Sequence, residues 1–354
     1  MAHASYPLTT EQPYPRRQWW AAATAAEVGR SLMARDILGE RVLLYRKEDG
    51  SAVAVSGICP HRAFPLEKGR LVGDSVQCSY HGFTFGADGA CQRVPSQAGV
   101  PQRAALRHYP LVERGGVLWI WTGEDALADP ALLPDLAGIG LDAPGWTVEI
   151  HALATVEARY TLLIENLLDL SHVTFIHAAT IPSGEKVAAL DVTVQTHGAG
   201  LTVARKAVGI APNPLIKLQF PDQEGLVDQE FDAQYMGPSL IRTGGTISDH
   251  ASGRPLGTQN FIHMITPAAP GRLHYFVATA RDFGHDNPAL GAMNIAMGTR
   301  IQPEDVEAIS AIEAVLRSDV PLPREVSARV DNGALLVRRL LEAQIRSEAE
   351  ALAA

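Results

Sequence analysis

The sequence predicts a two-domain protein of the α+β class, in which an all-β domain precedes a domain built on a mainly antiparallel sheet with helices. Its 354 residues exceed the length at which one hydrophobic core usually stops growing, so two domains are expected. Residues 15–124 contain short strand-like runs broken by turn residues. Residues 125–354 contain longer strand-like runs together with helical spacing of apolar residues, which favours an α+β arrangement there.

The elements of the first domain are short and end at turn signals. The stretch RVLLYRKEDGSAVAVSG, residues 41–57, indicates two strands joined by a Glu-Asp-Gly turn. GGVLWIWTG, residues 115–123, indicates an aromatic strand closed by glycine. The segment 124–145 is rich in Pro, Gly and Asp and has little strand pattern, so we expect it to connect the domains.

The second domain should contain longer strands and three helices. Strand patterns occupy residues 146–158, 190–208 and 271–283. Helical patterns lie near residues 158–172, 303–317 and 332–352. The last of these combines helical apolar spacing with mixed charge, which predicts a packing helix with one solvated face.

Composition and charge exclude several classes of function. A formal net charge of -9 without a Lys/Arg cluster argues against a nucleic-acid partner. No run of eighteen apolar residues occurs, so we expect no membrane partner, and the N-terminus lacks the apolar core of a secretion signal, so we expect a cytoplasmic protein. Three cysteines are too few for a disulfide framework, which makes metal ligation or plain packing the expected roles of the thiols.

Two cysteines and two histidines form the first candidate metal site. Cys59 and His61 stand in CPH, and Cys78 and His81 follow in CSYH after sixteen intervening residues. Structural zinc and four unrelated loop residues are alternatives, but zinc modules usually take paired cysteines from one segment and paired histidines from another. A binuclear cluster explains the mixed pairs better, with two thiolates on one iron and two imidazoles on the other, as in Rieske [2Fe-2S] centres. Cys91 has no second ligand beside it and is interpreted as a packed thiol.

The segment RYTLLIENLLDLSHVTFIH carries the second constellation. Asn166, Asp169 and His172 step by three, so on a helix they project to one side. His177 would lie about 140° around a continuous helix from His172, so the helix must end or distort near residues 173–175 if both imidazoles bind one ion.

A carboxylate completes this second set. Two imidazoles and one carboxylate form the facial triad of non-haem Fe(II) oxygenases. Pro303 suits the first turn of a helix, and Asp305 is followed by apolar residues at +4, +7 and +11, so its carboxylate should face the core. A buried carboxylate is costly unless it is paired or metal-bound, which favours ligation. Glu304 lies about 100° around the helix and is a weaker candidate. Stabilisation of the first helical turn by Asp305 is the alternative.

With both constellations in place, the chain resembles the Rieske non-haem iron oxygenases, specifically the oxygenase components of the group that contains vanillate O-demethylase, dicamba O-demethylase and toluenesulfonate methyl-monooxygenase. Four segments in order carry the resemblance, and they do not fix the substrate. They are residues 42–85, 108–123, 165–177 and 274–290 with the PEDVEAI that follows. The resemblance implies an N-terminal Rieske [2Fe-2S] domain and a catalytic domain of the helix-grip (START-like) type, a curved antiparallel sheet around a long helix.

The resemblance also implies residue roles. It assigns Cys59 and Cys78 to one cluster iron and His61 and His81 to the other. It assigns the mononuclear iron to His172, His177 and Asp305.

Three further residues take roles by resemblance. Asn166 matches an asparagine near the mononuclear iron. Asp169 matches an aspartate that links this iron to a cluster histidine of a neighbouring subunit, with His81 as the expected contact. His263 corresponds to a pocket histidine that contacts substrate. A head-to-tail homotrimer would bring cluster and iron of different chains close together.

The implied activity is O2-dependent monooxygenation of an aromatic acid by O-demethylation or methyl hydroxylation. Because the sequence has no GxGxxG or other nicotinamide or flavin fingerprint, NAD(P)H electrons must arrive through a separate reductase, with or without a ferredoxin. Cis-dihydroxylation of an aromatic ring by the same metals is one alternative. A non-catalytic Rieske electron-transfer or ligand-binding protein is the alternative from another class.

Overall fold

The computed structural model describes residues 14–150, 154–181 and 190–353, and these form two compact units. One unit consists of Tyr14–Leu133 together with Thr266–Pro270. The other consists of the described residues from Pro134 to Ile265 and from Gly271 onward. The segment 1–13, where no secretion signal was expected, and residues 151–153 of the expected strand 146–158 lie outside the described residues.

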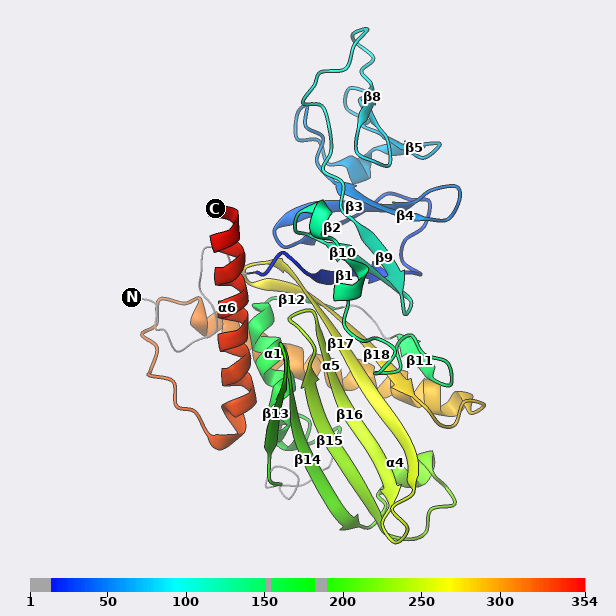
Figure 1. Cartoon of the computed structure of the whole chain (residues 1–354), viewed down its shortest axis with the longest axis vertical. Coiled ribbons are helices and arrows are strands. Elements are labelled where there is room, and N and C mark those ends of the chain that lie inside the picture. Colours follow the sequence, from blue (N-terminus) through cyan, green and yellow to red (C-terminus); the bar gives the residue numbers. More distant parts are fainter. Residues whose placement is uncertain (1–13, 151–153, 182–189, 354) are drawn as a thin grey trace. The chain divides into compact units, whose positions relative to one another are not determined.

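The first unit is all-β in its regular structure, apart from three 3-10 turns, as the sequence predicted (Figure 1). It contains three antiparallel sheets with the strand orders β1-β10-β9, β2-β3-β4 and β5-β6-β7-β8. The strands are β1 (Trp19–Thr24), β2 (Met33–Ile37), β3 (Glu40–Arg46), β4 (Ala52–Ser56), β5 (Arg70–Val72), β6 (Ser75–Gln77), β7 (Thr84–Phe85), β8 (Cys91–Arg93), β9 (Leu111–Arg114) and β10 (Val117–Trp121). The 3-10 turns are η1 (Leu66–Lys68), η2 (Asp125–Leu127) and η3 (Pro130–Leu132).

The aromatic strand predicted from GGVLWIWTG is β10, the middle strand of its sheet. All five of its residues are buried, which explains why this strand reads as a continuous apolar run. The expected hairpin at residues 41–57 is β3 and β4, in antiparallel register from Val42 opposite Ser56 to Arg46 opposite Ala52.

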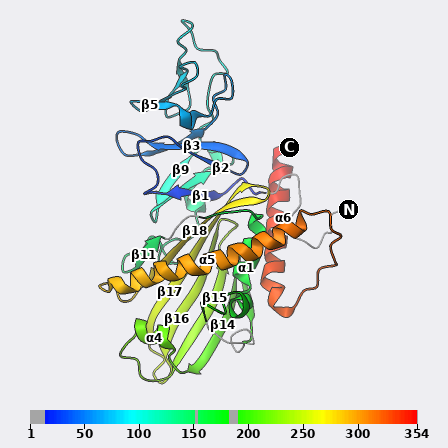
Figure 2. The same ribbon diagram turned by 180° about the vertical axis from the view of Figure 1, so that it is seen from behind.

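The second unit is built on one eight-stranded antiparallel sheet, which confirms the predicted α+β class. Its order is β11-β18-β17-β16-β15-β14-β13, and β12 also pairs with β18. The strands are β11 (Thr147–Ile150), β12 (Ala154–Val156), β13 (Thr193–His197), β14 (Gly200–Ile210), β15 (Val227–Tyr235), β16 (Leu240–Asp249), β17 (Pro255–Ala269) and β18 (Arg272–Arg281). The helices are α1 (Tyr160–Leu168), η4 (Leu170–His172), α2 (Val173–Ile176), α4 (Pro214–Gln219), α5 (Pro288–Leu316), η5 (Arg329–Asp331) and α6 (Asn332–Ala353). Seen from behind, the long helix α5 crosses one face of this sheet (Figure 2).

The predicted start of the long helix at Pro303 is wrong. The helix α5 begins at Pro288, where the Asn287 side chain accepts a hydrogen bond from the backbone N–H of Ala289, and Pro303 lies inside it. Asn before a first-turn proline is a strong start signal, and burial of one helix face outweighs the interior proline, which costs about 3 kcal/mol. Asp305 therefore sits in the middle of a helix, and a first-turn role for its carboxylate is excluded.

The break in the other site helix also lies earlier than predicted. The helix α1 ends at Leu168, and Asp169 has the non-helical angles φ -108° and ψ 89°. The carboxylate of Asp169 then caps the next turn by accepting the backbone N–H of Ser171, which is the local competition that ends the helix. Residues 173–175, where the break was expected, belong to the short helix α2 (Val173–Ile176).

The helices α1 and α5 are locked together by a buried ion pair. The Arg159 guanidinium donates to Glu313 across 2.6 Å, and the backbone N–H of Arg159, at the start of α1, donates to the same carboxylate. Since α1 leads to His172 and α5 carries Asp305, this pair fixes the two elements on which the second candidate site depends. None of the described helices combines the length and apolarity of a membrane-crossing segment.

Replacing Glu313 by alanine should lower the unfolding free energy of this unit by about 1.5–3 kcal/mol, because the charge-assisted hydrogen bonds from Arg159 to this buried carboxylate are lost. Denaturant unfolding followed by circular dichroism measures the change. Arg317→Ala is the matched control: Arg317 contacts the same carboxylate at 3.5 Å but its side chain is 57% exposed, so its loss should cost at most about 1 kcal/mol. Equal losses in both variants would contradict the importance of the buried pair.

Candidate functional site

The loops that carry the two Cys/His pairs have the same backbone hydrogen bonds. In the first, the N–H of Cys59 donates to the carbonyl of Phe64, and the N–H of Ala63 donates back to Cys59. In the second, the N–H of Cys78 donates to the carbonyl of Phe83, and the N–H of Gly82 donates to the carbonyl of Cys78. Each cysteine therefore opens an equivalent tight turn that brings its histidine to the loop tip.

Gly82 is required by the second loop. Its φ is +73°, and a Cβ atom there would lie 2.8 Å from the Pro95 side chain. Only glycine fits this left-handed and crowded position without a shift of its neighbours.

The thiols and the imidazoles of this group differ sharply in burial. Cys59 and Cys78 are each 1% exposed, whereas His61 and His81 are exposed and lie with ring centroids 4.6 Å apart. Burial raises the pKa of the Cys59 thiol to about 11, and the adjacent Cys78 adds to this rise. A thiolate pair in such a place needs a nearby cation to be stable, which a metal supplies.

The donor set fits a two-iron cluster better than one ion. Two buried sulfur donors and two exposed nitrogen donors fit a Rieske centre, in which two thiolates would hold one iron and two imidazoles the other. Among the residues that the structure describes, the only set of three or more candidate ligands close enough to share one ion lies elsewhere, in the second unit.

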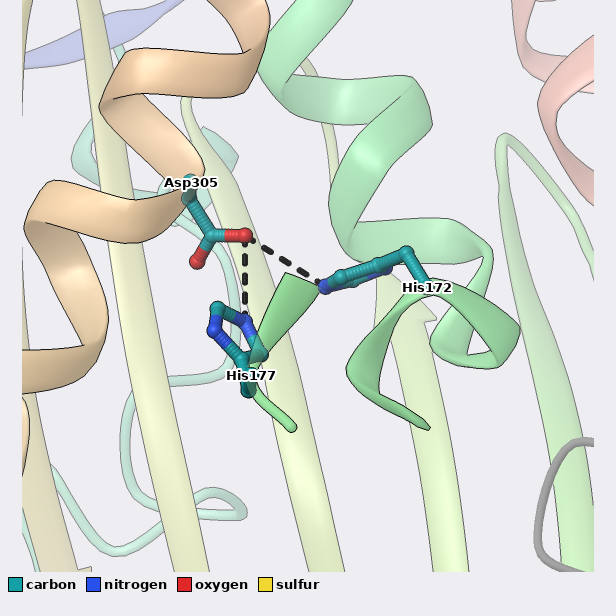
Figure 3. A group of neighbouring side chains, drawn as sticks. All are labelled: His172, His177 and Asp305. Atoms are coloured by element: carbon teal, nitrogen blue, oxygen red, sulfur yellow. Dashed lines mark ion pairs between the residues drawn. The ribbon is translucent and has the colours of Figure 1, made fainter. Parts of the chain in front are cut away.

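That second set consists of His172, His177 and Asp305, which Figure 3 shows facing one another from three different segments. Their ligand atoms all lie within 4.8 Å of one another. The Nε2 atoms of His172 and His177 are 3.4 Å and 3.2 Å from Oδ1 of Asp305. Asp305 is 4% exposed and His177 is 2% exposed. The structure thus brings together the three residues that the sequence proposed as one site.

The hydrogen bonds behind the two histidines show what this arrangement requires. Nδ1 of His172 meets the backbone carbonyl of Asp169, which can only accept, so this nitrogen carries the proton. Nδ1 of His177 lies 2.7 Å from a carboxylate oxygen of Glu304, so it carries the proton when Glu304 is ionised. In neutral imidazoles both Nε2 lone pairs then point at the Asp305 carboxylate. Three converging lone pairs repel one another unless a cation lies between them, so the residues fit a bound metal ion.

The pKa shifts agree with this electrostatic arrangement. Burial by itself raises the pKa of Asp305, but His172 and His177, when their rings are protonated, outweigh this effect and hold the pKa below its usual range. Burial lowers the pKa of His177, whereas Asp305 and Glu304 more than compensate and raise it. The site therefore favours positive charge next to Asp305.

The other two predicted residues of the segment lie beside this set and point in different directions. The Asn166 side-chain amide donates to Oδ1 of Asp305 across 3.2 Å, and its own oxygen is buried without a hydrogen-bond partner in the described structure. The Asp169 carboxylate does not face Asp305. It accepts bonds from the backbone and hydroxyl of Ser171 and pairs with Arg205 at 3.4 Å.

His263 is 8% exposed and has protein partners on both ring nitrogens. Its Nε2 lies 2.9 Å from the Thr243 hydroxyl and its Nδ1 lies 2.7 Å from the Tyr275 hydroxyl. The Tyr275 hydroxyl is near enough to Asp305 for the carboxylate to add to the rise that burial causes in its pKa. A direct substrate contact by His263 stays a prediction.

Sequence reasoning missed three contributors to this region. Glu304, considered only as a weaker ligand candidate, lies behind His177 and also accepts the Thr180 hydroxyl across 2.6 Å. Tyr275 sits in an apolar strand where it reads as a core residue. Arg205 was detectable, because it interrupts the alternating apolar positions of LTVARKA with a charge.

Family models match both parts of the chain. The Rieske [2Fe-2S] domain matches residues 18–110, and the vanillate O-demethylase oxygenase C-terminal domain matches residues 156–347, more than half of the 354. The chain belongs to the vanillate O-demethylase family of Rieske non-haem iron oxygenases. Family membership makes it an oxidoreductase and an oxygenase component, as the resemblance implied.

Relatives of this family match over almost the whole chain. The putative toluene-4-sulfonate monooxygenase system iron-sulfur subunit TsaM2 of Comamonas testosteroni is 32% identical over 93% of this chain and 97% of its own length. The oxygenase component of dicamba O-demethylase from Stenotrophomonas maltophilia is 30% identical over 93% of this chain and 97% of its own length. A crystal structure of dicamba monooxygenase bound to 3,6 dichlorosalicylic acid superimposes with a TM-score of 0.86 at 29% identity, covering 95% of this chain and 99% of that one.

Replacing Glu304 by alanine should weaken Fe(II) binding by about 10–100-fold, the usual effect of losing a partner behind a metal-bound histidine. The carboxylate fixes which nitrogen of His177 is protonated, so its loss frees the ring to rotate. Iron content after dialysis against graded chelator measures the change. Glu304→Gln retains an acceptor and should lose less. Glu307→Ala, at an exposed position of α5, is the matched control and should bind iron as the unmodified protein does; equal loss in that control would contradict the role of Glu304.

Proposed function

We propose that the chain is the terminal oxygenase of a multicomponent system and carries out O2-dependent monooxygenation of an aromatic acid, by O-demethylation or by hydroxylation of a methyl group. The observation that carries this proposal is the buried convergence of His172, His177 and Asp305 in a chain that also contains a Rieske domain. A buried facial triad leaves open positions for oxygen and a substrate, which an electron-transfer protein would not need.

The proposed ligands divide between the two units. Cys59 and Cys78 would hold one cluster iron, and His61 and His81 would hold the other. His172, His177 and Asp305 would hold the mononuclear iron. When bound, the cluster passes single electrons, and the mononuclear iron activates O2 for insertion into a C–H bond.

The remaining residues position these ligands. The Asn166 amide holds Oδ1 of Asp305, and the Asp169 carbonyl and Glu304 carboxylate keep the proton of each histidine on Nδ1. Burial of Asp305 and His177 excludes bulk water from the ligand atoms, which strengthens every electrostatic interaction among them. If a methoxyl carbon is oxidised, the product is a hemiacetal that releases formaldehyde.

Electron delivery is proposed to cross between chains of a homotrimer. Asp169 would link the mononuclear site to His81 of the partner subunit. Two exposed aromatic side chains support such a contact. Tyr80 precedes His81 in the sequence and is 59% exposed, and Phe175 stands between His172 and His177 in the sequence and is 66% exposed. Exposed aromatic residues beside functional groups are typical of contact surfaces.

The substrate class is proposed from the named relatives. Toluene-4-sulfonate and dicamba are both aromatic compounds with an acidic group and a methyl or methoxyl carbon, and 3,6 dichlorosalicylic acid is the ligand in the crystal structure of the dicamba enzyme. Buried polar groups such as His263 would orient an acid of this kind. We also propose that a separate reductase, with or without a ferredoxin, supplies NAD(P)H electrons, and that the system works in the cytoplasm, where NAD(P)H is available.

Metal analysis tests the oxygenase assignment. The purified protein, reconstituted anaerobically with iron and sulfide, should contain about three irons and two acid-labile sulfides per chain, because a Rieske cluster takes two of each and the triad one more. His172→Ala should lose one iron and no sulfide. Two irons in the unmodified protein would indicate an electron-transfer protein instead.

Product analysis with labelled oxygen tests the reaction type. Methoxylated and methylated benzoates and sulfonates, turned over with a surrogate reductase under 18O2, should give formaldehyde or an alcohol with one inserted oxygen atom. Oxygen uptake in step with product shows that electrons are coupled to chemistry. A cis-diol with two labelled atoms would show ring dihydroxylation instead.

Replacing Asp169 by alanine should abolish turnover even in protein saturated with Fe(II), where both metals are bound, because the proposed link to the cluster is lost. Asp169→Asn keeps the shape of the side chain and separates loss of charge from loss of packing. Iron and sulfide content, thermal unfolding and oxygen uptake are measured on each variant. Turnover at the level of the unmodified protein would contradict the linking role.

A further inference from the structure

Arg205 is a cation in an otherwise apolar position. On β14 the buried face carries Leu201, Val203, Arg205 and Ala207 in alternation. The Arg205 side chain is 1% exposed, and two of its three guanidinium nitrogens, Nε and Nη1, have no hydrogen-bond partner in the described structure. Burying a charged group is expensive unless a counter-charge compensates it, so the position needs an explanation.

Its counter-charge is Asp169. Nη2 of Arg205 lies 3.4 Å from Oδ1 of Asp169, and no other described carboxylate lies within ion-pair distance of this guanidinium. The Asp169 carboxylate is itself fixed at both oxygens, since Oδ1 also accepts the Ser171 backbone N–H and Oδ2 accepts the Ser171 hydroxyl. Arg205 is therefore the long-range anchor of a carboxylate whose other contacts are local.

This anchor acts on the turn that presents His172. The backbone carbonyl of Asp169 accepts a hydrogen bond from Nδ1 of His172. The same residue therefore contacts Arg205 through its side chain and His172 through its main chain. A shift of Asp169 would change the direction of the His172 ring. The ion pair thus connects β14, in the sheet, to a proposed iron ligand on η4.

We propose that Arg205 is a positioning residue that holds Asp169 in place, both as the support of His172 and as the carboxylate through which electrons enter. The second half of this statement rests on the proposed function, because it takes Asp169 to be the link to the cluster. Arg205 would not itself touch iron, oxygen or substrate. Its effect would pass through Asp169.

The chain contains a matched control for this ion pair. Arg242 on β16 pairs with Asp232 at 2.9 Å, its side chain is 15% exposed, and its Nε and Nη1 likewise have no hydrogen-bond partner in the described residues. The strand registers place Arg242 and Asp232 on the opposite face of the same sheet from Arg205. Arg242→Met therefore removes an equivalent ion pair that has no connection to His172.

The first measurement uses Fe(II) alone as the probe, on protein whose cluster is intact. Arg205→Met should weaken Fe(II) binding about tenfold, the lower end of the usual effect for partners behind a metal ligand, while Arg242→Met should leave it unchanged. The double variant Arg205→Met/Asp169→Asn should bind Fe(II) no more weakly than Asp169→Asn alone, because both changes act on one interaction. Additive losses, or equal losses in the Arg242 control, would overturn the proposal.

The second measurement follows electrons. Dithionite-reduced protein is mixed with O2 and toluene-4-sulfonate, vanillate or dicamba, and loss of the reduced-cluster absorbance is timed at matched iron content. Arg205→Met should slow the reoxidation phase that depends on the mononuclear iron and lower kcat with little change in KM, whereas a substrate anchor would raise KM. A raised KM with unchanged reoxidation would overturn the positioning role.

Two comparisons keep the outcomes distinct. If Asp169→Asn reoxidises its cluster normally, the proposed link through Asp169 fails, and with it the electron-entry half of this inference. If Asp169→Asn is impaired and Arg205→Met is normal in both measurements, only the inference about Arg205 fails. If Arg205→Met does not fold, Arg205→Lys is tested instead. Lysine retains the positive charge and the aliphatic chain but lacks the planar guanidinium group, so Fe(II) affinity and reoxidation rate should fall less than in Arg205→Met.

Discussion

The structure of the catalytic unit depends on one buried carboxylate, Asp305, and on the two imidazole nitrogens that face it. When the imidazoles are neutral and Glu304 is ionised, each histidine carries its ring proton on the side away from Asp305, so the three acceptor atoms converge without a proton of their own. In a low-dielectric interior such an arrangement is stabilised by positive charge at the acceptors. A metal ion would supply that charge, which agrees with the family to which the chain belongs.

The surrounding structure holds those acceptors in place. Glu313 in α5 binds Arg159 at the start of α1 and so fixes the two helical elements relative to each other. Asn166 and Glu304 then hold the side chains of Asp305 and His177, and Arg205 pairs with Asp169 in the turn after α1. A metal site on helices and a buried sheet can be held more precisely than one on loops alone.

In the first unit, the backbone of two loops determines which side chains are buried and which are exposed. Its two loops repeat one hydrogen-bonded turn, which buries both thiols and exposes both imidazoles. Buried sulfur and exposed nitrogen suit a cluster that must be shielded on one side and reachable on the other, because a partner can approach only the exposed histidines. The exposed Tyr80 beside His81 marks the side from which such an approach is proposed.

The sequence alone indicated the fold class, the two Cys/His loops and the three residues that the structure brings together in the second unit, because turn signals and ligand types are local features. The apolar stripe used to select Asp305 was only partly right, since Ile309 is buried but Ile312 is 46% exposed. It misplaced the start of α5 at Pro303, because a proline that suits a first helical turn lies inside a helix that begins at Pro288. It also put the break after α1 at residues 173–175, although Asp169 caps a new turn. Only the tertiary structure showed that Glu304 supports His177 and that Arg205 meets Asp169. These contacts join residues 127 and 36 positions apart, and a pattern within one segment carries no information about which distant charge will lie opposite it.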